Sequence, residues 1–404
     1  MKLLMLVMAI SSIALAEQKG TSISQIQSTI NETLASKWYE RIQLRGYAQL
    51  RYNRLLESNP NLTCSACDKS MGDKQGFFMR RARLTFYGEV TNKLYVYIQP
   101  DYATDASSNS QSYFQIRDAY FDYALSENKD FRIRSGISKV PFAFDNLQSS
   151  SNRAPLDRSD ALNTAAPNER DIGVYFMWAP TEIRKRFKEL TSNNLKGTGD
   201  YGLIAIGAYN GQTLNKPEKN NDLHRVVRAT YPFKLSNGQF IEASVQAYEG
   251  KYAAVTQVSE GNPTNYSDFY DQRSAASLIF YPQPLGFQVE YNIGQGPEYD
   301  PKSNSVRTKS LKGGYAQVYY QAYYENHRFF PFIRFQEYQG GRKLDDLAKM
   351  YRVREWEFGT EWQMNSALEL TMAYAISDRL TQSNSSNRLD EQGQLLRLQA
   401  QFNY

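Results

Sequence analysis

Arginine side chains recur at alternate positions in segments whose other alternate positions are mostly apolar. Successive side chains of a β-strand point to opposite faces, so these arginines would share one polar face. They are Arg41, Arg45, Arg51, Arg81, Arg83, Arg132, Arg134 and Arg397. A guanidinium group presents a fork of N–H donors that matches phosphate and other oxyanions, so such a face could attract small anions. Arg80 has the opposite parity unless a β-bulge lies at the start of its segment.

Glutamates occupy the corresponding polar positions of segments in the second half of the chain. They are Glu242, Glu290, Glu355, Glu357, Glu361 and Glu369. If the arginines and glutamates face each other across water, their opposite charges produce a transverse field that orders dipolar solutes. A single charge at such a position needs no special role, because a solvated interior accepts any polar side chain.

Cys64 and Cys67 are the only cysteines of the chain. In an exported protein their spacing favours a disulfide within a small loop, although C-x-x-C pairs also serve redox and zinc chemistry. A zinc site would need two more ligands, and His224 and His327 are distant in sequence. The sequence offers no recognisable nucleophile with a base, and we expect no cofactor and no metal.

The N-terminus carries the pattern of an export signal. Met1-Lys2 precedes an apolar run that ends in Ala14-Leu15-Ala16, a pair of small residues flanking one larger residue. This pattern predicts a signal peptide over residues 1–16 that is cleaved after Ala16. The mature chain would therefore act outside the cytoplasm.

The composition is unusual for an exported soluble domain. Aromatic residues make up 14% of the chain, yet the mean hydropathy is −0.61. After the signal, no stretch approaches the roughly 20 apolar residues of a membrane helix. A transmembrane β-barrel reconciles these facts, because half of each strand lines water while aromatic side chains gather at both membrane interfaces. The net charge of +5 is too small to indicate binding to nucleic acid.

Alternation and turn residues mark sixteen candidate strands, an even number as in bacterial outer-membrane barrels. They are residues 41–53, 77–90, 93–103, 113–125, 130–139, 170–179, 201–210, 222–231, 239–249, 271–282, 286–295, 310–324, 329–338, 352–363, 367–377 and 393–404. Connections after odd-numbered strands are long and polar, as in 54–76, 140–169, 250–270 and 378–392, whereas most others are short turns. This alternation is typical of long external loops and short periplasmic turns.

The connection over residues 180–200 breaks this pattern. It contains Arg184-Lys185-Arg186 and is long where a short turn is expected. Either the sixth strand extends further or this segment is an unusual periplasmic element.

The last strand alternates from Leu396 to Tyr404 and nothing follows it. Within lipid an open strand edge is not tolerated, so this strand should pair with the first one. We therefore predict an all-β fold, a transmembrane antiparallel β-barrel of about 16 strands over residues 41–404. Residues 17–40 would form a short periplasmic helix, which would act either in oligomerisation or as a linker.

The chain resembles the phosphate-selective porin O and P family. The resemblance covers most of the mature chain and is clearest from Leu44 to Val174. It is carried by the order and spacing of four segments: Leu44-Arg45-Gly46-Tyr47-Ala48-Gln49, Phe78-Met79-Arg80-Arg81-Ala82-Arg83-Leu84, Ile98-Gln99-Pro100-Asp101 and Gly136-Ile137-Ser138-Lys139-Val140-Pro141-Phe142.

The resemblance implies a trimeric sixteen-stranded barrel whose third external loop folds inward and forms a constriction. That loop would be residues 140–169. The positions that match the anion-contacting residues of the family are Arg45, Arg80, Arg81, Asp101, Ser149 and Ser150, to which the alternation adds Arg83 and Arg397. The family also has a lysine in this loop, where this sequence has Asn146.

We therefore expect an outer-membrane porin that passes small hydrophilic solutes, with a bias toward anions such as phosphate. Its partners would be these solutes, outer-membrane lipid and two further copies of the chain. A weakly selective general porin is the alternative within transport. An enzymatic barrel would need a nucleophile and a base, and a purely structural barrel would fill its interior with apolar residues.

Overall fold

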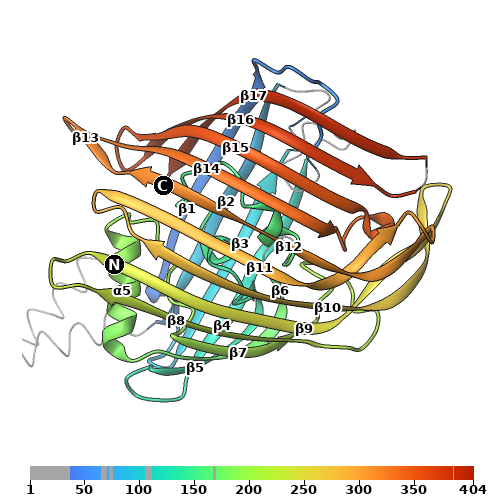
Figure 1. The fold of residues 1–404 in the computed structure, drawn as a ribbon. Helices are drawn as coiled ribbons and strands as arrows, with labels where there is room; N and C mark the ends of the chain where they lie inside the picture. The colour runs from blue at the N-terminus through green and yellow to red at the C-terminus, as the bar shows by residue number, and fades with distance from the viewer. Residues whose placement is uncertain (1–36, 65–70, 72–75, 105–111, 167–169, 385) are drawn as a thin grey trace, which may run out of the picture.

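The computed structural model describes residues 37–64, 71, 76–104, 112–166, 170–384 and 386–404. These residues form one large antiparallel β-sheet (Figure 1). Its strands are β1 (Ile42–Leu55), β2 (Phe77–Glu89), β3 (Leu94–Ala103), β4 (Tyr113–Ala124), β5 (Phe131–Lys139), β6 (Arg170–Trp178), β7 (Ile204–Tyr209), β8 (His224–Lys234), β9 (Phe240–Ser259), β10 (Asn262–Phe280), β11 (Leu285–Asp300), β12 (Ser305–Tyr320), β13 (Ala322–Tyr324), β14 (His327–Gly341), β15 (Met350–Gln363), β16 (Leu368–Gln382) and β17 (Arg388–Asn403).

The sheet closes on itself because β1 pairs with both β2 and β17. In the closing pair Tyr47 lies opposite Asn403 and Leu50 opposite Ala400. The short strand β13 continues β12, since both pair with β14, and the barrel therefore has sixteen strand positions. The predicted closed barrel, and the pairing of the last strand with the first, are confirmed.

The alternation of the strands places apolar residues outside and polar residues inside. In β8 the outward Val227 and Phe233 are 46% and 47% exposed, whereas the inward Arg228 and Thr230 are buried. Every second residue of a strand faces lipid and its neighbours face the interior. This division explains how a chain with low mean hydropathy can present an apolar outer surface.

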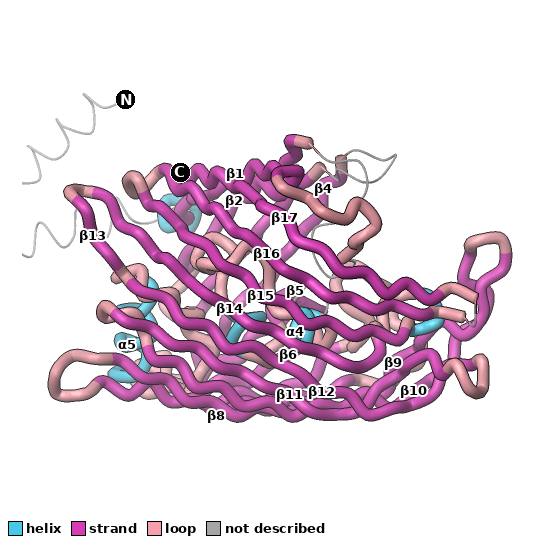
Figure 2. Tube along the Cα trace, turned by 45° about the horizontal axis from the view of Figure 1, so that its top comes forward, coloured by secondary structure: helices cyan, strands magenta, loops and turns pink. Residues whose placement is uncertain are grey.

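The two ends of the barrel differ in their connections. One end, which we call the short-turn end, carries short turns such as those between β2 and β3 and between β4 and β5. The opposite end, which we call the loop end, carries the connection from β5 to β6. The C-terminus lies at the short-turn end, together with β13 and α5 (Figures 1 and 2).

Two external loops predicted from the sequence are wrong, because they are largely strand. β9 and β10 extend to Ser259 and Asn262, which pair across the turn at Glu260 and Gly261, so residues 250–270 form a hairpin. Most of residues 378–392 likewise pairs within β16 and β17. These extensions mix polar and apolar residues on both faces, so they lack the alternation that marks a strand beside lipid.

The exceptional connection over residues 180–200 is an additional element and not a longer strand. It contains helix α5 (Thr181–Ser192), whose buried residues Ile183, Phe187 and Leu190 recur at three- and four-residue spacing. They pack in a cluster with Phe144 and Tyr281. Helices α3 (Phe144–Leu147) and α4 (Asp160–Asn163) belong to the connection between β5 and β6. Within the described residues, no helix has both the length and the apolar character needed to cross a membrane.

The predicted signal peptide, and residues 17–36 of the predicted N-terminal helix, lie outside the described residues. Trp38–Arg41 forms a short 3-10 helix, η1, directly before β1. Cys64 is buried and disulfide-bonded. Its predicted partner, Cys67, lies outside the described residues.

Candidate functional site

The connection between β5 and β6 (residues 140–169) is called the inward loop, and its described residues, 140–166, lie inside the ring of strands (Figure 1). Arginines on opposite parts of the barrel hold its backbone and its carboxylates. Arg51 and Arg397 pair with Asp157 at 3.0 and 2.5 Å. Arg379 pairs with Asp160 at 2.6 Å, and Arg273 donates to the carbonyl oxygen of Ala161 at 3.0 Å. These contacts tether the loop to β1, β10, β16 and β17 and narrow the interior.

The first helical turn of the inward loop is held by a glutamate. Glu290 of β11 accepts hydrogen bonds from the backbone N–H groups of Phe144 and Asp145, at 2.6 and 3.0 Å. Both N–H groups belong to the N-terminal turn of α3, where backbone donors have no partner within the helix. A carboxylate of the barrel therefore supplies the acceptors that this buried helix end requires.

Four of the six glutamates predicted to oppose the arginines across water are instead ion-paired inside the protein, whereas Glu369 accepts hydrogen bonds from Gln401 and Asn403. Glu357 contacts Arg334 at 2.6 Å and Arg397 at 3.1 Å. The remaining pairs are Glu355 with Arg379, Glu242 with Arg228, and Glu361 with Lys196. The expectation of two opposed charged faces is wrong for these four, because Arg334, Arg379 and Arg228 lie on strands adjacent to their partners and Lys196 lies in the connection that contains α5.

The α5 connection (residues 179–203) enters the barrel from the short-turn end. Lys196 forms an ion pair of 2.5 Å with Glu361 of β15, and both side chains are 2% exposed. The ammonium group of Lys196 also lies 4.4 Å from the centroid of the Phe330 ring. Gln148 of the inward loop donates to the carbonyl oxygen of Lys196 at 2.7 Å. The two inserted segments therefore support each other within the barrel.

Three of the predicted site residues meet in one hydrogen-bonded cluster. Arg83 donates to Asp101 at 3.1 Å and to the Ser150 hydroxyl at 3.1 Å. The Tyr47 hydroxyl is 2.6 Å from the Ser150 hydroxyl and accepts from Arg83 at 2.8 Å. Ser149 lies beside this cluster, with its hydroxyl 2.9 Å from that of Ser151. Arg397 is separate, because it holds Asp157.

A β-bulge brings Arg80 to the inner side. Gln49 pairs with Arg81 and Leu50 with Met79, so Arg80 is the extra residue on β2. A bulge shifts the alternation by one residue. Phe78, which has the same parity in sequence as the outward Leu84 and Phe86, therefore faces inward and is 5% exposed. Arg80 and Arg81 are therefore consecutive arginines that both contribute to the interior.

A second bulge, which the sequence reading missed, adds Arg117. Gln99 pairs with Asp118 and Pro100 with Ile116, so Arg117 is the extra residue of β4. Arg117 and Asp118 are both buried. The sequence carried a signal for this feature, because two adjacent charged residues interrupt an otherwise alternating strand.

The arginines from the two bulges crowd together beside the inward loop. The Asp101 carboxylate is attracted electrostatically by three guanidinium groups, those of Arg81, Arg83 and Arg117. Burial, with the neighbouring guanidinium groups of Arg153, Arg117 and Arg81, lowers the pKa of Arg158 in the inward loop well below its usual value. Arg81 is 6% exposed, and no ion pair or side-chain hydrogen bond joins it to another described residue. This region has a positive potential that an anion would relieve.

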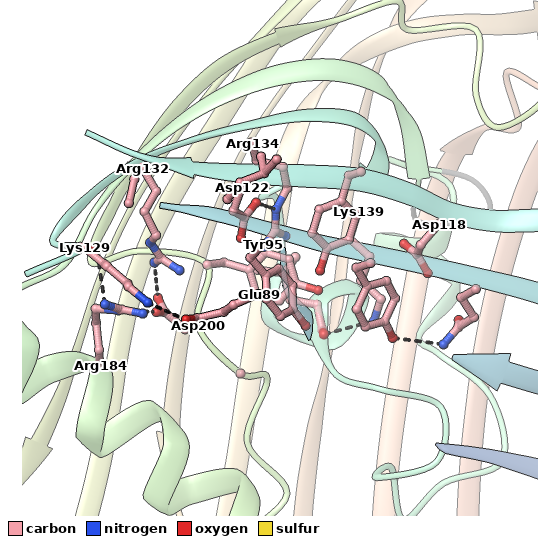
Figure 3. A pocket seen from close by; sticks show the side chains of 18 of the residues that line it. Glu89, Tyr95, Asp118, Asp122, Lys129, Arg132, Arg134, Lys139, Arg184 and Asp200 are labelled. Atoms are coloured by element: carbon pink, nitrogen blue, oxygen red, sulfur yellow. Dashed lines mark hydrogen bonds and ion pairs between the residues drawn. The ribbon is translucent and has the colours of Figure 1, made fainter. Parts of the chain in front are cut away.

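A cavity of about 430 Å³ extends from the inward loop toward the short-turn end; we call it the turn-end cavity. Figure 3 shows its charged side chains, several of which are paired across it. Among the described residues its lining has nine basic and four acidic side chains. The basic residues are Arg45, Arg83, Lys93, Lys129, Arg132, Arg134, Lys139, Arg170 and Arg184, and the acidic ones are Glu89, Asp118, Asp122 and Asp200. The turn-end cavity is therefore a basic passage that contains Arg45, Arg83, Ser149 and Ser150 from the predicted set.

A family model for the phosphate-selective porin O and P family matches residues 63–404. The chain belongs to this family. The match covers three of the four segments that carry the resemblance, among them those with Arg80, Arg81 and Asp101, whereas the segment that contains Arg45 precedes its first residue. Family and fold indicate a channel rather than an enzyme, and they associate this porin with the bacterial outer membrane.

Solved porin structures share the fold of this porin at low sequence identity. OmpF of Salmonella typhi, solved in complex with daunomycin, has a TM-score of 0.57 at 15% identity. The outer-membrane channel DcaP of Acinetobacter baumannii has a TM-score of 0.53 at 14% identity, and an anion-selective porin from Comamonas acidovorans has a TM-score of 0.50 at 9% identity. Each comparison covers 90% of this chain and 97–99% of the other. No match was found among curated protein sequences.

Proposed function

We propose that this porin is a passive channel of the outer membrane with a bias toward small anions such as phosphate. The observation that carries the proposal is the buried guanidinium group of Arg81, which lies beside Arg80 and Arg83 and has no partner among the described residues. Buried polar groups in proteins nearly always have partners, so this group is poised to receive a passing anion or its water. The basic lining of the turn-end cavity supports the same bias.

The proposed path runs past the inward loop as the constriction and then along the arginines of β1 to β5. Arg45, Arg80, Arg81 and Arg83, with Ser149 and Ser150, would offer successive donors to the anion. Asp101 would moderate the positive charge, and Arg397 would contribute by holding the loop. Several sites of moderate strength allow an ion both to enter and to leave.

The remaining expectations belong to the same proposal. Residues 1–16 would be removed on export, and residues 17–40 would remain on the periplasmic side. We propose a homotrimer because the family resemblance implies one, and because an OmpT structure of Vibrio cholerae with the same fold was solved in a trimer form. The disulfide of Cys64 would close a small external loop through Cys67.

Single-channel recording in planar bilayers tests the proposal. With a salt gradient we expect a reversal potential that shows anions to be more permeant than cations, and partial block of chloride current by phosphate. A reversal potential at zero would favour the weakly selective general porin, and cation preference would contradict the anion bias.

Replacing Arg81 by alanine should lower the anion-to-cation permeability ratio by roughly threefold or more. A unit positive charge about 10 Å away in water lowers the energy of a permeating anion by about 0.4 kcal/mol and raises that of a cation by the same amount, so the two effects add in the ratio. The ratio is measured from reversal potentials of native and variant porin under the same gradient. Arg225→Gln is the matched control, since it removes an equal charge whose side chain is 78% exposed on the outer side of β8. An unchanged ratio for Arg81→Ala would contradict the assigned role.

A further inference from the structure

Tyr97 and Tyr120 line one side of the turn-end cavity, and Tyr87 continues their row on the neighbouring strand β2. Tyr87, Tyr97 and Tyr120 are direct cross-strand neighbours on the inner side of β2, β3 and β4. The rings of Tyr97 and Tyr120 are stacked, with centroids 5.1 Å apart and planes 13° apart. The rings of Tyr87 and Tyr97 have centroids 6.4 Å apart. The three side chains form a continuous aromatic row.

An arginine lies at each end of this row. One of the two is paired with a carboxylate and the other is not. Arg134 lies 4.0 Å from the Tyr120 centroid and donates two hydrogen bonds to Asp122, at 2.7 and 2.9 Å. Its charge is therefore neutralised by a carboxylate. Arg45 lies 4.7 Å from the Tyr87 centroid, and no ion pair joins it to a described carboxylate. Arg45 thus presents an available positive charge to the cavity.

Tyr95 adds an unstacked ring next to this charge. It lies two residues before Tyr97 on β3, lines the cavity and is half-buried. Its side chain has no ring contact or hydrogen bond to another described residue, and Arg45 and Tyr97 are among its electrostatic neighbours. Figure 3 shows Tyr95 among the charged side chains of the cavity. Arg45 is hydrogen-bonded to Tyr97 but has no carboxylate partner among the described residues, so an aromatic face and an un-neutralised guanidinium group line the same part of the cavity.

A hydrated inorganic anion would use the charge of Arg45 and gain little from an aromatic face. An anion with a flat ring would use both, because ring–ring contact and an Arg–oxyanion pair are separate favourable terms. The cavity volume of about 430 Å³ lies in the range of roughly 300–1,000 Å³ that is usual for small-molecule sites.

We propose that the turn-end cavity binds organic anions that carry a flat ring beside a phosphate or carboxylate group. Arg45 pairs with the anionic group, and Tyr95 stacks on the ring. The ordered row of Tyr87, Tyr97 and Tyr120 holds Arg45 in place. This inference rests on the proposed function, because the ligand reaches the cavity through the pore.

Block of chloride current in planar bilayers tests this assignment with probes matched in their anionic group. Phenyl phosphate is compared with inorganic phosphate, and benzoate with acetate, each added to either side of the membrane. We expect the ring-bearing member of each pair to block at a concentration roughly three- to tenfold lower. Equal block within both pairs would overturn the ring site, while anion preference in the reversal potential would show that the proposed function still holds.

Substitutions at Tyr95 test whether this residue causes the stronger block by ring-bearing anions. Tyr95→Leu should abolish the difference between phenyl phosphate and phosphate while leaving block by phosphate itself, and Tyr95→Trp should retain the difference. Tyr123→Leu is the matched control, because Tyr123 lies on the outer side of β4 and is 45% exposed. A ring preference that survives Tyr95→Leu would contradict the assignment. The comparison of probes on the native porin needs no variant and remains decisive if a variant fails to fold.

Discussion

Replacing Asp157 by leucine is expected to release the inward loop and to raise the single-channel conductance. The carboxylate of Asp157 pairs with Arg51 and Arg397 at the inner side of β1 and β17, and it is 10% exposed. Burial alone would raise the pKa of Asp157, but Arg51 and Arg397 hold it well below its usual range. The carboxylate is therefore charged, and leucine would leave two buried guanidinium groups without it.

Loss of one partner from a buried ion pair typically costs about 3–5 kcal/mol. For Asp157→Leu we expect that cost in the free energy of unfolding, measured by denaturant titration of the folded barrel in detergent. The inward loop should also move away from β1 and β17, so the pore should widen. Conductance in planar bilayers measures this second effect.

Asp390→Leu provides the control for Asp157→Leu. Asp390 lies near the loop end of β17, is 41% exposed, and pairs with Arg352 and Arg388. Exposed pairs contribute about 1 kcal/mol or less, so this variant should keep the native stability and conductance. If Asp157→Leu also keeps the native conductance, Asp157 does not position the loop at the constriction.

The second large effect is expected from Lys196→Met, which breaks the link between the α5 connection and β15. The variant leaves Glu361 buried without its ammonium partner, which should cost about 3–5 kcal/mol of unfolding free energy. The contact of Lys196 with Phe330 is lost as well. Because Lys196 also accepts from Gln148 through its backbone, the two inserted segments should loosen together and conductance should rise.

Two further variants separate the ion pair from general damage to this segment. Lys185 on α5 pairs with Glu182, with side chains 68% and 75% exposed, so Lys185→Met should change stability by about 1 kcal/mol or less. The double variant Lys196→Met with Glu361→Leu removes both charges and should recover most of the lost stability. If the double variant is no more stable than Lys196→Met alone, the buried charge of Glu361 is not the cause.

The site itself was only partly predictable. The alternation identified Arg81, Arg83 and Arg397 as inward residues, and the resemblance added Asp101 and Ser150. The proximity of Arg83, Asp101 and Ser150 depends on the path of the inward loop, which no local pattern specifies. Alternating charge did not identify Arg117 or Tyr95, because a bulge takes Arg117 out of the alternation and a tyrosine carries no charge.

The sequence by itself determined the barrel, the approximate positions of its strands and the pairing of its ends. Lipid outside and water inside impose a two-residue period on every strand, and that period is visible along the chain. The tertiary structure alone decided which charges remain available. Loop length does not say whether a loop folds outward or inward, and a one-residue bulge reverses the direction of the side chains beyond it. Four of the six glutamates are therefore ion-paired inside the barrel, whereas Arg45 and Arg81 have no carboxylate partner among the described residues.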